Sequence, residues 1–141
     1  MSFHETPTTF LDMDLERSAA NRLANDHIKP LVEEWSGMPD LELTSFYGIR
    51  EYSEDAWLRG HIDRIDTHVL SVTISIQKLD EEGNDLKVGD RDPWPLQGIG
   101  YDGKVMRYDH PAGTMVLYES SKIVDSFVLN AASLMRQFSH F

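Results

Sequence analysis

The sequence contains no cysteine among its 141 residues. Disulfide bridges and thiolate metal sites are therefore excluded, and thiols say nothing about the redox state of the compartment. Cationic residues are also scarce, since 13 Lys and Arg face 24 Asp and Glu, which gives a formal net charge of −11. A surface with this excess of negative charge repels nucleic acid and anionic membranes, so we expect neither as a partner.

Long apolar runs are absent as well. No segment approaches the run of about 20 apolar residues that a membrane-spanning helix needs. The N-terminus, MSFHETPTTFLDMD, lacks the basic and apolar regions of a signal peptide, so we expect a cytoplasmic protein. Apolar residues at 40% and charged residues at 26% are typical of a globular chain. Together with the length, these values predict one domain over residues 1–141.

The N-terminal part predicts helices. Residues 1–10 are expected to form a loose polar leader, and helical spacing of apolar residues begins near Asp14. The apolar stripe consists of Leu15, Ala19, Leu23, Ile28, Leu31 and Trp35. Pro30 removes a backbone donor, so the pattern predicts a kinked helix or two shorter ones. Ser36-Gly37 ends the helical signal. We therefore expect bracing helices over 14–36.

From residue 41 onward the pattern favours strands. The clearest alternation places the apolar residues Leu70, Val72, Ile74 and Ile76 between the polar residues Ser71, Thr73, Ser75 and Gln77. Its polar face could line a central pocket or face solvent, and the alternation does not decide between them. Leu79–Asp92 is acidic and aperiodic, which indicates a loop. Turns at Asp102-Gly103 and Pro111–Gly113 separate further strands, and His110 beside the second turn is expected to be exposed. At least seven strands are predicted, so the fold class is mainly β with N-terminal helices.

A histidine and an aspartate stand two residues apart within the run Tyr52–Ser71. Residues i and i+2 of a strand face the same way, so His61 and Asp63 would point together. An imidazole and a carboxylate are two of the three ligands that hold non-haem Fe(II) in many oxygenases. On spacing alone, a strand-end pair that faces solvent remains an open alternative.

Four segments in series resemble one family. They are YGIREY (47–52), HIDRIDTHVLSVTISI (61–76), DPWPLQ (92–97) and YDGKVMRYDHPAGTMVLYESSK (101–122). Together they are similar to the Fe(II)/2-oxoglutarate-dependent dioxygenases of the prolyl 4-hydroxylase-like group, from about residue 35 to the C-terminus. The resemblance implies a double-stranded β-helix (a cupin-like jelly roll) over 41–141. It also implies that His61 and Asp63 bind iron and that Tyr52, nine residues before His61, contacts 2-oxoglutarate.

The C-terminal part departs from this family. The family's distal His-Gly-Arg-Pro, which carries the third iron ligand, has no counterpart after Tyr118–Lys122, and Asp125 and Ser126 stand in its place. Asp125 is therefore a candidate third ligand. Arg136 is the cation nearest to the position that pairs with the distal carboxylate of 2-oxoglutarate. His140 matches a family position that does not bind iron.

The resemblance implies Fe(II) and 2-oxoglutarate as cofactors and leaves ascorbate open as a third. It implies hydroxylation of a peptidyl proline or of a small molecule. The altered C-terminal part leaves three alternatives: an enzyme with Asp125 as ligand, a divergent form of an ordinary enzyme, and a jelly-roll binding protein without turnover. The sequence does not indicate an oligomeric state.

Overall fold

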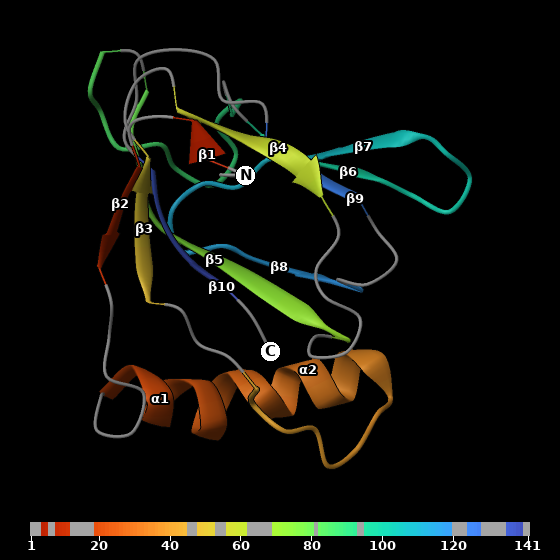
Figure 1. Ribbon diagram of the computed structural model, residues 1–141. Helices are drawn as coiled ribbons and strands as arrows, with labels where there is room; N and C mark the ends of the chain where they lie inside the picture. Colours follow the sequence, from red (N-terminus) through yellow and green to blue (C-terminus); the bar gives the residue numbers. More distant parts are fainter. Residues whose placement is uncertain are drawn as a thin grey trace.

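The chain folds into two five-stranded sheets and a row of helices (Figure 1). The structure is a computed structural model, and it describes residues 4–5, 8–11, 19–44, 48–52, 56–61, 69–80, 82–92, 95–119, 124–127 and 135–139. For the strands at 4–5, 8–11, 57–61, 124–127 and 135–139 it describes the backbone.

Every strand pair in both sheets is antiparallel. The first sheet has the order β1-β4-β9-β6-β7, and the second has the order β2-β3-β10-β5-β8. The strands of the first sheet are β1 (His4–Glu5), β4 (Trp57–His61), β9 (Val124–Phe127), β6 (Leu96–Ile99) and β7 (Val105–Tyr108). Those of the second are β2 (Thr8–Leu11), β3 (Ile49–Tyr52), β10 (Met135–Ser139), β5 (Ser71–Lys78) and β8 (Met115–Tyr118). Among the described strands, consecutive ones mostly alternate between the sheets. The exceptions are β2 and β3, which pair although the helices lie between them in the chain, and β6 and β7, which form a hairpin that projects from the body in Figure 1.

The N-terminal residues correct a prediction. The segment 1–10, expected to be a loose leader, contains β1 and most of β2. β1 pairs with β4 of the first sheet, and β2 pairs with β3 of the second. Thr8–Leu11 is TTFL, and β-branched and aromatic residues of this kind suit a sheet edge. The polar composition of the segment concealed this local strand preference.

The helices form one row below the second sheet in Figure 1. They are α1 (Ala19–Leu23), a π-helical segment η1 (Ala24–Ile28) and α2 (Lys29–Ser36). The interruption expected near Pro30 is present as a change of helix type, since the π-helical segment ends at Ile28 and the proline lies in the first turn of α2. The helix ends as predicted at Gly37, which has φ 68° and donates its N–H to the Glu33 carbonyl. None of these described helices is long and apolar enough to cross a membrane.

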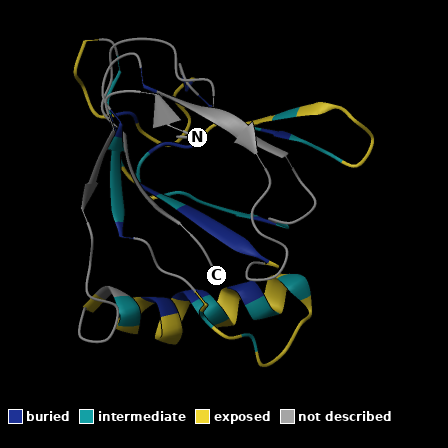
Figure 2. Ribbon diagram, viewed as in Figure 1, coloured by how far each residue is buried: buried dark blue, intermediate teal, exposed yellow. Residues whose placement is uncertain are grey.

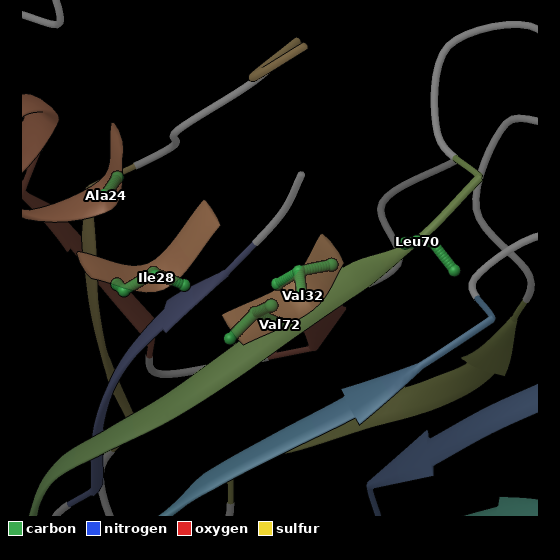
Figure 3. Packing of buried hydrophobic residues seen from close by; sticks show 5 residues of the cluster. All are labelled: Ala24, Ile28, Val32, Leu70 and Val72. Atoms are coloured by element: carbon green, nitrogen blue, oxygen red, sulfur yellow. The ribbon is translucent and has the colours of Figure 1, made fainter. Parts of the chain in front are cut away.

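Helices and second sheet share a small apolar core. Figure 3 shows Val32 of α2 beside Val72 of β5, and Ala24, Ile28 and Leu70 complete the cluster. The predicted stripe is wrong at Leu23, Leu31 and Trp35, because these side chains are about half exposed, at 49%, 48% and 50%. Figure 2 shows buried and exposed positions alternating along the row of helices. A π-helix closes its turns from i to i+5, so η1 shifts the phase that a regular helix would keep.

Replacement of Val32 by alanine is expected to lower the free energy of unfolding by about 2 kcal/mol, since Val32 is fully buried and the smaller side chain leaves a cavity. Its neighbour Leu31 provides the matched control. Leu31→Ala should cost much less, because that side chain is 48% exposed. Urea unfolding followed by circular dichroism measures both, and equal losses would contradict this assignment of the core.

Candidate functional site

The polar face of β5 is inside the protein. Ser71, Thr73 and Ser75 are 0%, 0% and 1% exposed, while Val72 on the other face packs against the helices. Of the two alternatives that the alternation left open, burial therefore excludes the solvent-facing one. A strand that buries hydroxyls on one face and apolar groups on the other separates a polar interior from the helical core.

A β-bulge adds a lysine to this polar face. Gln137 of β10 pairs with Ser75 of β5, and its neighbour Arg136 pairs with Gln77. Ile76, which lies between Ser75 and Gln77, therefore has no partner on β10. One extra residue reverses the alternation of the strand beyond it. Lys78 consequently shares the side of Ser75 instead of the helical side, and it is 0% exposed.

Lys78 belongs to a buried ion pair. Its ammonium group donates to Asp92 Oδ2 over 2.6 Å, and both side chains are 0% exposed. The same oxygen accepts the backbone N–H of His110 at 2.7 Å. Arg107 Nη2 donates to the Asp92 carbonyl at 2.6 Å. Asp92 therefore ties the end of the loop after β5 to β7 and to the segment that follows β7.

His110 corrects a second prediction, since it is 1% exposed although its place before a turn suggested exposure. Neither ring nitrogen, nor the hydroxyl of Ser75, has a hydrogen-bond partner among the described residues. Burial, aided by the nearby Lys78 charge, lowers the pKa of His110 to about 4, against weaker opposing effects of backbone groups and of Asp92. The imidazole is therefore neutral at pH 7, with one donor and one acceptor facing the interior.

Tyr52 is 1% exposed and lies at the end of β3. Burial raises the pKa of its hydroxyl, while the hydrogen-bonded Arg50 guanidinium opposes that rise. Arg50 is half-buried, and the sequence analysis did not single it out. The available signal was its position two residues before Tyr52 in a strand, which places both on one face.

The register relates these groups to the buried face of β5. We call residues paired directly across neighbouring strands a row. One row joins Tyr52, Met135 and Lys78. The next joins Arg50, Gln137 and Ser75. Paired residues share a face of the sheet, so Tyr52, Arg50 and the polar face of β5 form one surface.

Arg136, the predicted partner of the 2-oxoglutarate carboxylate, falls between these rows. It pairs with Glu51 on one side and with Gln77 on the other. The register thus brings Arg136 next to the strand of Tyr52 but not into its row. Its role stays a prediction.

Two of the three predicted metal ligands, His61 and Asp125, lie in the first sheet. His61 at the end of β4 pairs with Asp125 of β9, and Asp125 pairs with Gly98 of β6. Two residues 64 positions apart in the chain are thus brought side by side in one row. Asp63 lies outside the described residues. Within the part that the structure describes, no three His, Asp or Glu side chains come together as a metal site.

A pocket opens beside this row. It has a volume of about 80 Å³ and lies between the β6–β7 hairpin and β8. Its lining residues are Leu96, Gly98, Met106, Tyr108, Val116, Leu117 and Tyr118. Gly98 is thus both a wall of the pocket and the neighbour of Asp125 in the row. Gly98 therefore connects the pocket to the row of His61 and Asp125.

Comparison with known proteins finds a likeness of structure and none of sequence. No family model matches the chain, and no curated protein matches it by sequence. The crystal structure of a prolyl-4-hydroxylase from Pseudomonas putida superposes with a TM-score of 0.67 at 17% identity, covering 95% of this chain and 71% of that chain. At this identity the likeness concerns the fold. The chain therefore has a β-rich fold similar to that of a prolyl-4-hydroxylase.

Proposed function

We propose that this protein is a metal-dependent oxygenase that hydroxylates a small molecule or a peptidyl proline with 2-oxoglutarate as co-substrate. The observation that carries the proposal is the pairing of His61 with Asp125. The resemblance implies that His61 binds iron, and Asp125, which stands in place of the family's third ligand, is a candidate ligand; the fold brings the two to neighbouring positions beside a pocket. The similarity to a prolyl-4-hydroxylase fold supports the same reaction class.

The two sheets, in this proposal, form a double-stranded β-helix. The chain passes from β3 to β4, then to β5 and β6, and so changes sheet at each step. It changes sheet again from β8 to β9 and from β9 to β10. Antiparallel strands that alternate between two sheets are the pattern of a jelly roll.

His61, Asp63 and Asp125 would hold the metal. One imidazole and two carboxylates are a donor set that suits Fe(II), although it is more anionic than two imidazoles and one carboxylate. When bound, iron supplies the oxidative chemistry, and the protein supplies orientation and exclusion of water. The row that contains His61 and Asp125 would fix the ligand positions, because the two residues pair directly across neighbouring strands.

The polar surface of the second sheet would bind 2-oxoglutarate. Tyr52 offers a hydroxyl, and Arg50 beside it offers a cation for a carboxylate. The hydroxyl of Ser75, buried without a partner among the described residues, is a further donor in the row of Arg50. The Lys78 charge is already balanced by Asp92, so we assign that pair to stability.

An anaerobic titration with Fe(II) and 2-oxoglutarate tests this function. We expect the visible charge-transfer band of the chelate to appear with the unaltered protein. His61→Ala and Asp125→Ala should each weaken Fe(II) binding by about a hundredfold or more, because loss of groups that only orient a ligand already costs about 10- to 100-fold. Calorimetric titration with Fe(II) gives the affinities.

Asp26→Ala is the matched control, since Asp26 is an exposed carboxylate on η1, and it should leave the affinity unchanged. Normal binding by Asp125→Ala would remove Asp125 from the ligand set. A folded protein that binds neither iron nor 2-oxoglutarate would contradict the proposed oxygenase activity and would favour a binding protein without turnover.

A further inference from the structure

The pocket between β6–β7 and β8 has walls of one chemical kind. The seven lining residues that the structure describes are all uncharged. The Tyr108 hydroxyl donates to Met106 Sδ at 3.1 Å, so this polar group is engaged within the wall. Leu96, Val116 and Leu117 supply aliphatic surface.

We propose that this pocket binds a branched aliphatic group of the substrate and so selects an uncharged, apolar side chain. The inference rests on the proposed function in one respect, the presence of a reaction centre at the row of His61 and Asp125. Gly98 belongs to this row and also lines the pocket, so a group bound there lies next to the predicted ligands.

The size of the pocket sets the size of the group. Apolar cavities of about 150 Å³ bind benzene, which has six non-hydrogen atoms. A pocket of about 80 Å³ is roughly half as large. It therefore suits a group of about three or four non-hydrogen atoms, such as the branched end of leucine or valine, and excludes a phenyl ring.

The lining sets the charge of the group. A carboxylate or ammonium transferred into this pocket would lose water without gaining an opposite charge from the described lining residues. Burial of an apolar group, in contrast, gains free energy in proportion to the area removed from water. The pocket should thus bind an aliphatic side chain much more tightly than a charged side chain of equal size.

Binding of capped amino acids to the metal-free protein tests this inference. The probes are N-acetyl-leucine methylamide and the nearly isosteric N-acetyl-aspartate methylamide, and the readout is the shift of the Met106 methyl resonance in NMR spectra. We expect the leucine probe to bind at least about tenfold more tightly. Equal affinities, or shifts confined to other methionines, would overturn the inference.

Free leucine provides a second arm, because the aliphatic group could belong to a peptide or to a small molecule. A preference for the capped probe indicates a peptide substrate, and a preference for free leucine indicates an amino acid. The metal-free format keeps the two proposals apart. Failure of the probes with intact iron binding would remove this pocket assignment alone, and probe binding without iron binding would remove the reaction and leave the pocket.

Two variants of one strand sharpen the result, and calorimetric titration with the probes measures their binding, because replacement of Met106 removes the Met106 resonance. Met106→Trp fills the pocket and should abolish leucine-probe binding, whereas Val105→Trp alters the next residue, which is 64% exposed, and should leave it unchanged. Should Met106→Trp fail to fold, Met106→Ala enlarges the pocket instead. It should then shift the preference toward N-acetyl-phenylalanine methylamide, and an unchanged preference would contradict the inference.

Discussion

Asp92→Ala is expected to lower the free energy of unfolding by about 3–5 kcal/mol, the usual cost of leaving one member of a buried ion pair without its partner. Lys78 and Asp92 are both 0% exposed and 2.6 Å apart, so water cannot replace the lost carboxylate without opening the interior. The same substitution removes the acceptor of the His110 backbone N–H. Urea unfolding at pH 7 measures the loss.

The direction of the pH dependence adds a second readout. Burial already lowers the pKa of Lys78, and Asp92 is the main group that opposes this shift. Without Asp92 the pKa of Lys78 falls further below its unfolded value, so the folded state binds fewer protons than the unfolded state. Stability of Asp92→Ala should therefore rise as the pH is raised toward 10.

Two controls separate the buried pair from charge in general. The double variant Lys78→Met with Asp92→Leu removes both charges and should be much less destabilised than Asp92→Ala, because no unpaired charge remains. Asp102→Ala removes an exposed carboxylate whose Lys104 partner is 81% exposed, and it should change stability little. A double variant as unstable as Asp92→Ala would show that the packing of the two side chains, and not the unpaired charge, determines the loss of stability.

The alternation of apolar and polar residues and the turn signals predicted several elements of the fold correctly. β5 coincides with the alternation over Ser71–Gln77, and the turn at Asp102-Gly103 joins β6 to β7 as predicted. Alternation shows that two faces differ, but it does not show which of them lies inside a protein with two sheets. The burial of Ser71, Thr73 and Ser75 depends on the first sheet, which the local pattern of β5 does not encode.

Irregular backbone accounts for the positions at which the sequence patterns predicted the wrong face of a strand or helix. The bulge at Ile76 reverses the side of Lys78, and the π-helical segment at 24–28 shifts the apolar stripe. Both are single-residue effects of register, and periodicity analysis assumes that register is constant. Asp92 and His110 meet across 18 residues of sequence, so no short motif announces their contact.

Some residues of the candidate site could likewise be selected from the sequence, and others could not. Tyr52 and His61 could be selected through the family resemblance, and the register joins His61 to Asp125. Arg50 escaped notice because it has no place in the pattern that selected Tyr52. The contact between the two side chains exists because an extended strand turns alternate residues to one face.

Acid should destabilise this protein through His110 as the pH falls from 6.5 to about 4. The pKa of His110 is about 4 in the folded state against an ordinary value of 6.5, because the imidazole is buried near the Lys78 ammonium. The unfolded state therefore binds the proton first as the pH falls. Stability that is complete above pH 6.5 is lost progressively down to about pH 4, and the loss amounts to about 3 kcal/mol.

The measurement is the free energy of unfolding between pH 7 and pH 4, combined with the NMR titration of the His110 ring. In His110→Leu the loss in this window should largely disappear, since the group that takes up the proton on unfolding is gone. His27→Leu, a replacement on the exposed side of η1, should retain the loss. The carboxylates of Asp80 and Asp102 have pKa values lowered by hydrogen bonds, so their contributions are lost below pH 3.8, outside this window. A ring that titrates near 6.5 in the folded protein would mean that the imidazole gains water or a partner in the interior, and the neutral, buried histidine would then no longer explain the acid sensitivity.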